Sequence, residues 1–324
     1  MAGLRLAIIV DPLSRMLPDK DTTFILMLEA QRRGHTLFAI DHRDLFTKGP
    51  DVHAMARRAE VHRPSAPGEP HWTHFESSIV ALADFDAVLM RSDPPFDDDY
   101  LYATHLLSLV EERGVFVMNR PRGLRDANEK LYALNFPDCI PRTLVTRDMG
   151  QLKQFLAELG GEMIVKPPHG FGGLGIFHVH ADDRNLNAIL ETMTDNGRKL
   201  LMAQEYLAAV RELGDERVIL LDGEPLGAVA RVPRDDEHRS NIHVGGSVKK
   251  VVIGDRERRI CERIGPRLRA DGLHFVGIDV IGDHLTEVNV TSPTGIQEID
   301  QLDGVQLETP VIEFVERKVA ELKR

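Results

Sequence analysis

The chain has 324 residues, and its 40 Lys and Arg against 51 Asp and Glu give a formal net charge of −11. A chain of this length can bury two or three well-developed cores, so its stability requires neither disulfides nor a structural metal. The acidic balance leaves no basic face large enough to neutralise a nucleic-acid backbone, which argues against nucleic acid as the main partner.

The beginning of the chain carries no targeting or membrane signal. The apolar run in MAGLRLAIIVDPL is short and meets Asp11 and Pro12, so it predicts neither a secretion signal nor a membrane span. The two cysteines, Cys139 and Cys261, have no histidine motif nearby and are interpreted as packing residues. A reducing, cytoplasmic location is the simplest expectation.

The first 120 residues alternate between strand and helix patterns. Continuous apolar runs predict strands at 4–10, 35–41, 86–97 and 115–119, and helical spacing predicts helices at 22–34 and 98–113. This order predicts a parallel sheet wrapped by helices. Residues 47–74 are rich in Pro, Gly and His and predict an irregular excursion or a hairpin with little core. Their histidines lack convincing ligand spacing and favour a scattered surface set over a metal site.

A glycine-rich segment follows, in MIVKPPHGFGGLGIFHV (163–179). Two apolar strands flank a loop that contains Gly170, Gly172, Gly173 and Gly175. Glycines let backbone N–H groups wrap a phosphate chain without Cβ clashes, and Lys166 adds a positive charge. Strands on both sides exclude the dinucleotide fingerprint and the Walker loop, which need a helix directly after the glycines. Taken alone, the segment fits a flexible hairpin loop as well as a phosphate lid.

The segment FVGIDVIGDHLTEVNV (275–290) predicts a hairpin. With a three-residue loop, Gly282 to His284, Asp279 lies opposite Glu287, and Asn289 lies further along the same face. Opposed carboxylates destabilise a sheet unless a cation lies between them. Oxygen donors without sulfur or imidazole favour Mg²⁺. A solvated hairpin face is the alternative, and a loop one residue longer or shorter would move Asp279 to the other face.

The glycine-rich segment and the predicted hairpin occur together with further sequence motifs. The chain also contains LMRSDPPFDDDYLYATHLL, NRPRGLRDANEKLYAL, MAQEYL, GDERVILLDGEPLGAVARVP and NVTSPTGIQEID. With them it resembles the prokaryotic glutathione synthetases of the ATP-grasp superfamily over nearly its whole length. The resemblance implies an α/β fold, with an α+β lid, in which an ATP-grasp fold follows a parallel-sheet N-terminal domain. The implied domains are residues 1–127, a central lid at 128–209 and a C-terminal catalytic domain at 210–324.

The resemblance implies a ligase that joins γ-glutamylcysteine and glycine, with ATP as co-substrate. Lys130 and Lys166 would hold the ATP phosphates under the closing loop 170–175, and Asp215 would make a polar contact to the nucleotide. Adenine would pair with the backbone of a four-residue segment, Gln204, Glu205, Tyr206 and Leu207. The implied ligands of Mg²⁺, or Mn²⁺, are Asp279, Glu287 and Asn289.

The implied reaction passes through an acyl phosphate that the glycine amine attacks. Negative charge builds up on oxygens in both steps, and we expect Arg231, with Lys166 and Arg217, to stabilise it. The resemblance also places Arg217, Arg231, Arg239 and Asn241 around the reacting carboxylate.

Two further segments are candidate substrate contacts. Arg91 and Asp93 lie at the carboxyl end of a predicted strand, where ligands usually bind in open parallel sheets, although a plain turn also explains the prolines that follow. The resemblance implies that a second segment, Thr291, Ser292, Pro293 and Thr294, wraps a substrate carboxylate. Helix capping through Thr294 is the alternative.

Two other functions remain open from the sequence. One is a related ATP-grasp ligase with a different acceptor, against which the DPPFD and NVTSPTG motifs argue. The other is a nucleotide-binding regulatory protein without turnover, against which both lysines and all three metal ligands argue. A homo-oligomer, tetramer or dimer, is expected from the resemblance, without membrane or nucleic-acid partners.

Overall fold

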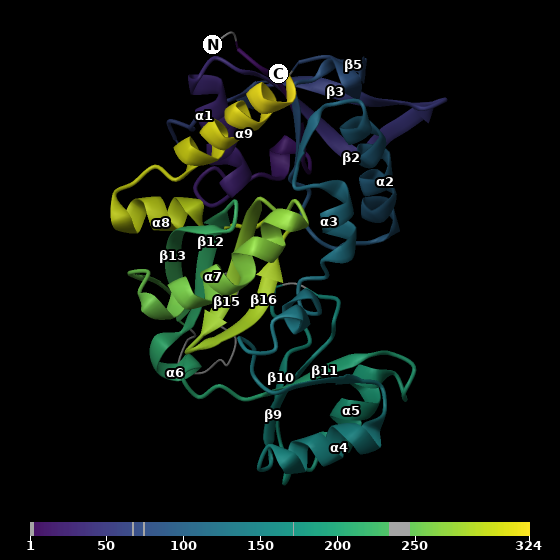
Figure 1. Ribbon diagram of the computed structural model, residues 1–324, viewed down its shortest axis with the longest axis vertical. Coiled ribbons are helices and arrows are strands. Elements are labelled where there is room, and N and C mark those ends of the chain that lie inside the picture. The colour runs from purple at the N-terminus through teal and green to yellow at the C-terminus, as the bar shows by residue number, and fades with distance from the viewer. Residues whose placement is uncertain (1–2, 67, 74, 171, 233–246) are drawn as a thin grey trace.

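The computed structural model describes residues 3–66, 68–73, 75–170, 172–232 and 247–324. Within these residues the strands form three sheets, which follow one another along the long axis of the molecule (Figure 1). One sheet belongs to the N-terminal third, one to the middle of the chain and one to its last part, and the sheet from the last part lies between the other two (Figure 1). We call them the N-terminal sheet, the lid sheet and the catalytic sheet.

The N-terminal sheet has the strand order β4-β3-β2-β1-β6-β7, with β5 paired to β3. Its strands are β1 (Arg5–Ile9), β2 (Thr36–Lys48), β3 (Asp51–Val61), β4 (Trp72–Thr73), β5 (Ser77–Ala81), β6 (Ala87–Met90) and β7 (Phe116–Met118). The predicted parallel pairing is correct for β1, β2, β6 and β7. β3 and β4 lie within the segment 47–74, for which an excursion or a hairpin was predicted, and they pair antiparallel, as does β5.

The prediction of little core in residues 47–74 is wrong. β2 and β3 form a long hairpin, as one of the two alternatives had it. Val52, Ala54 and Ala56 of β3 are nearly fully buried, because alternate side chains of this strand point into the apolar core. His53 and Met55, which alternate with them, point to the opposite face.

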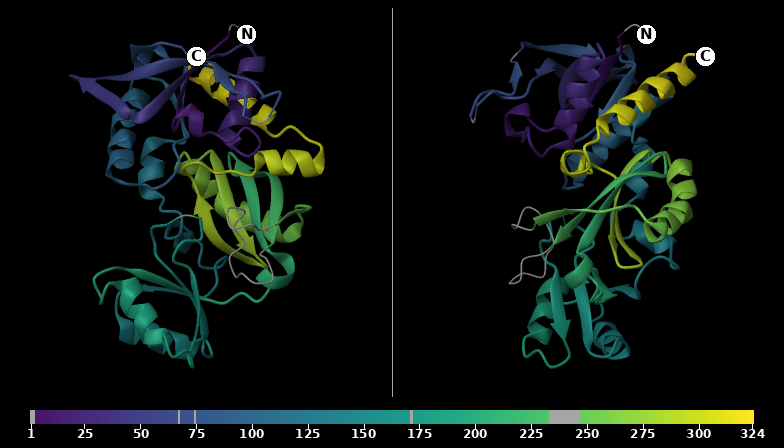
Figure 2. Two further views of the ribbon diagram at one scale, coloured as in Figure 1. Left: turned by 180° about the vertical axis from the view of Figure 1, so that it is seen from behind. Right: turned by 90° about the vertical axis from the view of Figure 1, so that its left-hand side faces the viewer.

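Helices cover both faces of the N-terminal sheet (Figure 2). They are α1 (Thr22–Arg32), α2 (Asp98–Glu112), α3 (Pro121–Asp126) and, from the other end of the chain, α9 (Glu308–Leu322). α2 begins where Asp97 accepts a hydrogen bond from the Tyr100 backbone N–H at 3.0 Å, an N-cap that supports the predicted start. Short 3-10 turns lie at η1 (Leu13–Arg15), η2 (Leu82–Asp84) and η3 (Tyr132–Asn135).

α9, near the C-terminus, packs against the N-terminal part of the chain. Its apolar residues Val311, Phe314 and Val315 are buried in one core with Leu6 and Phe24. Polar contacts reinforce this packing, because the Glu316 carboxylate accepts hydrogen bonds from the Arg33 guanidinium at 2.7 and 2.9 Å. The two termini therefore lie at the same end of the molecule (Figure 1).

The lid sheet has the antiparallel order β10-β9-β11-β8. Its elements are β8 (Thr143–Thr146), α4 (Met149–Glu158), β9 (Glu162–Lys166), β10 (Phe177–His180), α5 (Leu186–Thr194) and β11 (Leu201–Glu205). Met163, Val165 and Val179 point to one face and are fully buried in a core shared with α4 and α5. The alternate residues face the rest of the protein, and the short α6 (Val210–Leu213) leads back toward it.

The catalytic sheet has the antiparallel order β14-β13-β12-β15-β16. Its elements are β12 (Asp215–Leu221), β13 (Glu224–Val232), β14 (Ser247–Lys250), α7 (Asp255–Ala270), β15 (Phe275–Ile281), β16 (His284–Asn289) and α8 (Ile296–Asp303). α7 covers one face through Ile260, Ile264 and Leu268, and α8 covers part of the other (Figure 2). Among the described helices, none has the length and apolar composition that a membrane crossing requires.

Candidate active site

A cleft of about 860 Å³ lies between the lid sheet and the catalytic sheet. Most of the site residues expected from the sequence line it. They are Asp93, Lys166, Gly172, Gly173, Gln204, Glu205, Tyr206, Leu207, Asp215, Arg217, Arg231, Asp279, Glu287, Asn289, Thr291, Ser292, Pro293 and Thr294. Arg239 and Asn241 lie outside the described residues.

The register of the catalytic sheet brings the charged residues together. Asp215 of β12 is paired with Arg231 of β13, and Arg217, two residues on, is paired with Asp279 of β15. Because side chains two residues apart share a face, these charges all lie on the cleft face.

The predicted opposition of Asp279 and Glu287 is correct, although the predicted loop is wrong. Ile281 pairs with His284, so the turn has two residues, and an irregularity between Asp279 and Val280 shifts the register by one. The bulge restores the alignment that a three-residue loop would have given. Asn289 Nδ2 donates to Asp279 Oδ2 at 3.3 Å, so the three expected metal ligands are neighbours.

Two arginines hold Asp279. Arg217 Nε donates to Oδ1 at 2.6 Å, and Arg231 Nη2 lies 3.0 Å from Oδ2. Although burial alone would raise the pKa of Asp279, these two positive charges hold it well below its usual range. Asp279 is therefore an ionised carboxylate at neutral pH, with the negative charge that a divalent cation requires.

The pKa of Asp215 is shifted in the opposite direction, upward. Its Oδ2 accepts a hydrogen bond from Arg231 at 2.5 Å, yet burial and the nearby Asp279 raise its pKa to about 6. Its Oδ1 and the Arg231 Nε atom are buried without a hydrogen-bond partner in the described part of the chain. Buried polar atoms without partners usually mark a ligand site, which supports a contact by Asp215 and Arg231 to a bound molecule.

The two lysines converge on Glu287. Lys166 Nζ lies 3.5 Å and Lys130 Nζ 3.6 Å from Glu287 Oε1. Burial lowers the pKa of Lys166 despite this carboxylate. Burial also acts on Lys130, but Glu287 and Glu129 together raise its pKa above the usual value. The arrangement concentrates positive charge beside the carboxylates that we expect to bind a metal.

The glycine loop lies over Lys130, which donates from Nζ to the Gly170 carbonyl at 2.7 Å. Gly170, Gly172, Gly173 and Gly175 all have positive φ angles, between 68° and 147°, which other residues rarely adopt. Lys130, Gly170 and Gly175 do not line the cleft directly. The loop connects β9 to β10, as predicted.

The segment expected for adenine begins on β11. Gln204 is buried, and its Nε2 donates to Thr143 Oγ1 at 3.0 Å, which fixes the end of the strand. Tyr206 follows the strand, and its ring is stacked on that of His178, with centroids 4.0 Å apart. This stack forms part of the cleft wall.

Arg91 faces a second, smaller cavity of about 230 Å³ beside the cleft. Asp93 and Thr294 line both cavities. Arg91 Nε donates to Thr23 Oγ1 and Nη2 to the Pro293 carbonyl, both at 3.0 Å. Nη1 is buried and has no hydrogen-bond partner among the described residues, and burial lowers the pKa of the guanidinium to about 10.

The TSPTG segment does not cap a helix through Thr294. α8 begins at Ile296, its N-cap is Gly295 with a φ of 130°, and no side chain caps it. Instead, the Thr294 carbonyl accepts a hydrogen bond from Arg217 Nη1 at 3.1 Å. The segment thus connects the arginines of the cleft to Arg91.

Several cleft residues were not expected from the sequence. Ile164 shares the face of Lys166 two residues away, and strand alternation in EMIVK could have identified it. Glu129 could have been noticed as the neighbour of Lys130. Leu17, Lys20 and Asp21 line the cleft because the N-terminal unit packs against the catalytic sheet, and no local pattern signals that contact.

Family models and known relatives agree with one another. The N-terminal domain model of the prokaryotic glutathione synthetases matches residues 4–125, and their ATP-grasp domain model matches residues 129–304. A glutathione synthetase of Pseudomonas syringae pv. tomato is 44% identical over 319 residues, which are 98% of each chain. One of Gloeobacter violaceus is 46% identical over 318 residues, 96% of each chain.

Solved structures resemble the fold at much lower identity. A D-cycloserine synthetase is 16% identical, with a TM-score of 0.66 over 97% of this chain and 99% of its own. The ATP-grasp ligase PsnB, complexed with its minimal precursor, is 18% identical, with a TM-score of 0.64 over 98% of this chain and 100% of its own. At these identities the likeness concerns the fold alone.

Proposed function

The chain belongs to the prokaryotic glutathione synthetases of the ATP-grasp superfamily, and on that premise we propose how its cleft joins γ-glutamylcysteine to glycine. The observation that carries the proposal is the cluster of four cationic side chains, Lys130, Lys166, Arg217 and Arg231, around the carboxylates of Asp279 and Glu287. Arg231 and Lys130 also contact Asp215 and Glu129, yet the Arg231 Nε atom stays buried without a partner among the described residues, which fits an anionic ligand at this cluster.

Asp279, Glu287 and Asn289 would hold Mg²⁺, or Mn²⁺ in its place. All three offer oxygen atoms from one face of one hairpin, which is the donor type that these hard cations prefer. The ion would neutralise charge between the β- and γ-phosphates of ATP. Lys130 and Lys166 would bind the same phosphates, and segment 204–207 with Asp215 would bind the nucleoside.

Arg231 and Arg217 would stabilise the reacting groups. The substrate carboxylate would attack the γ-phosphate and displace ADP to give an acyl phosphate, and the glycine amine would then attack the acyl carbon, lose a proton and displace phosphate to form the amide. Oxygens gain negative charge in both steps, and buried guanidinium groups fixed by Asp279 and Asp215 need no reorganisation to meet it. The glycine loop would close over the phosphates because an acyl phosphate exposed to water hydrolyses.

The smaller cavity would hold part of the dipeptide. Arg91 lines this cavity, and its Nη1, buried without a partner among the described residues, is a cationic donor that suits a substrate carboxylate. Asp93 would contact the substrate amine, and residues 291–294 would wrap a carboxylate between the two cavities. Arg239 and Asn241 would complete the site around the reacting carboxylate.

We also propose the division into 1–127, 128–209 and 210–324, with the middle unit moving as the lid. A homo-oligomer in the cytosol is the proposed working form. The exposed Met55 and Ile79 are cross-strand partners on β3 and β5 and offer an apolar surface for a second copy. Light scattering of the purified protein would measure the number of subunits.

One experiment tests the function directly. ADP release is measured with Mg-ATP and a panel of dipeptides and amino acids. We expect stoichiometric ADP only when γ-glutamylcysteine and glycine are both present, with alanine and serine much poorer acceptors because a side chain must fit a closed site. Comparable rates with D-alanine or glutamate would indicate a different acceptor, and no ADP with any thiol dipeptide would indicate a regulatory nucleotide-binding protein.

A further inference from the structure

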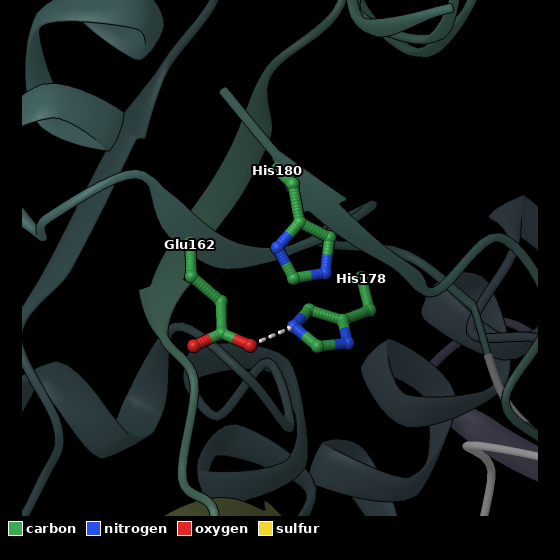
Figure 3. Close-up of side chains that lie close together, drawn as sticks. All are labelled: Glu162, His178 and His180. Atoms are coloured by element: carbon green, nitrogen blue, oxygen red, sulfur yellow. Dashed lines mark hydrogen bonds and ion pairs between the residues drawn. The ribbon is translucent and has the colours of Figure 1, made fainter. Parts of the chain in front are cut away.

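Three potential metal ligands lie together on the lid sheet, away from the carboxylates of the catalytic sheet. His178 and His180 are two residues apart on β10, so their side chains share a face. Glu162 of β9 is the cross-strand partner of His180. The potential ligand atoms of the three residues all lie within 4.8 Å of one another. Figure 3 shows the three side chains close together, with the Glu162 carboxylate in contact with the His178 ring.

We propose that Glu162, His178 and His180 form a binding site for Zn²⁺ or a similar divalent transition-metal ion. Two imidazoles and one carboxylate are a ligand set that zinc sites use, with water in the fourth position. Imidazole suits Zn²⁺, Cu²⁺ and Ni²⁺, whereas Mg²⁺ prefers the all-oxygen set of the catalytic sheet. The two sites therefore select different ions, and this inference does not depend on the proposed function.

The scaffold holds two of the three ligands, Glu162 and His178, nearly in place. His178 Nε2 lies 2.8 Å from Glu162 Oε1, as a hydrogen bond. Zn–N and Zn–O bonds of about 2.0–2.2 Å in a tetrahedron separate neighbouring ligand atoms by roughly 3.3 Å, so an ion replacing the shared proton needs a shift of a few tenths of an ångström.

The neighbouring packing prevents the ligand-bearing face from turning away. Met163, Val165 and Val179 alternate with the ligands and are fully buried under α4 and α5. The His178 ring is also stacked on Tyr206, with an interplanar angle of 17°, which fixes the plane of one ligand. An ordered imidazole loses less conformational entropy on binding a metal.

An ion bound at this site would link the two strands that flank the glycine loop. β9 and β10 are the two strands that the glycine loop connects, and Lys166 lies on the same face four residues, or roughly 13 Å, from Glu162. A metal bound to both strands would cross-link the base of the loop. It would also restrain Tyr206, a residue of the proposed adenine segment, through its stack on His178.

Direct binding measurements test the site. Metal-stripped protein is dialysed with Zn²⁺ in the presence of excess Mg²⁺, which competes for the all-oxygen set of the catalytic sheet, and a parallel sample is titrated with Co²⁺. We expect one retained equivalent of Zn²⁺ and the intense visible bands of four-coordinate Co²⁺. Both signals should be lost in His180→Gln and in Glu162→Gln, whereas His105→Gln, a change of an exposed histidine on α2, should keep them.

Other outcomes overturn the inference. Retained zinc that is equal in the wild type, His180→Gln and Glu162→Gln would place the metal elsewhere. If the wild type retains no zinc and shows no cobalt bands, the three residues do not form a metal site, and Glu162 and His178 are only an ion pair. His180 is exposed, so its replacement should not disturb folding, and far-ultraviolet circular dichroism of each variant checks this.

Discussion

Replacement of Glu287 by Gln tests the centre of the proposed site. Gln keeps the length of the side chain and one acceptor oxygen but removes the charge. In the wild type that charge lies 3.5 Å from Lys166 Nζ and 3.6 Å from Lys130 Nζ, directly opposite Asp279. The substitution therefore weakens the metal site and both lysine contacts to the phosphates at once.

The expected loss of activity is large. A single electrostatic contact to a transition state in a closed site is worth about 10²–10³ in kcat, or roughly 2.7–4 kcal/mol. Because Glu287 supports several such contacts, we expect a loss near the upper end, about 10³-fold, with a higher Mg²⁺ concentration needed for half-maximal rate. The rate of ADP release at increasing Mg²⁺ concentration measures both quantities.

The fold should survive this change. Lys130 keeps its contact to Glu129 at 2.6 Å, so only Lys166 loses its nearest described carboxylate. Removing one partner of a fully buried ion pair costs about 3–5 kcal/mol, and we expect less here because the Glu287 side chain is 19% exposed. Cooperative urea unfolding should therefore persist.

Glu224→Gln is the matched control, because it removes the same charge from an exposed position of β13 on the same sheet. We expect its turnover to equal that of the wild type. Turnover of Glu287→Gln within a factor of a few of the wild type, at the same Mg²⁺ concentration, would refute the role of Glu287 as a metal ligand.

Three further predictions concern the lid, the dipeptide and the acidic end of α8. Cleavage within residues 166–176 by a protease should slow when Mg-ATP and substrate are added, and equal rates would contradict loop closure. Arg91→Lys should raise KM for γ-glutamylcysteine about tenfold or more while KM for ATP stays constant, since one ammonium cannot contact Thr23, the Pro293 carbonyl and the substrate in the way that the planar guanidinium does; a parallel rise in both would contradict this role. Burial and the neighbouring Glu308 raise the pKa of Asp300 to about 7, so the native state keeps a proton that the unfolded chain has released, and stability falls as pH rises through 7. Asp300→Asn should therefore raise Tm at pH 8 more than at pH 5, and an equal change at both pH values would argue against the titration of Asp300.

The sequence predicted local structure well and packing between distant segments poorly. The strand and helix patterns placed β1, α1 and α2 nearly at their observed bounds, because apolar periodicity is a local signal, whereas the strand predicted at 86–97 ends at Met90. The opposition of Asp279 and Glu287 was also correct, although the reason was not. The sequence could not reveal the bulge, because a two-residue turn followed by one bulge gives the same alignment of Asp279 with Glu287 as a three-residue loop without a bulge.

Contacts between segments far apart in the chain had no local sequence pattern that could predict them. The Arg217 and Arg231 contacts to Asp279 depend on β12 lying between β13 and β15, an order that the chain connectivity does not specify. Strand β3 was missed as a buried strand because small alanines, rather than large apolar residues, occupy its inner face. The cluster of Glu162, His178 and His180 was likewise missed, since the glutamate lies 16 residues before the nearer histidine in the chain.

The packing of α9 against the N-terminal sheet has a consequence for synthesis on the ribosome. Leu6, Phe24 and Met27 are made first, but part of their cover, Val311 and Val315, is made last. This apolar surface stays accessible to solvent and chaperones while nearly 300 intervening residues are translated. The N-terminal unit can therefore reach its final stability only after translation is almost complete, and a nascent chain stalled before α9 would be prone to aggregation.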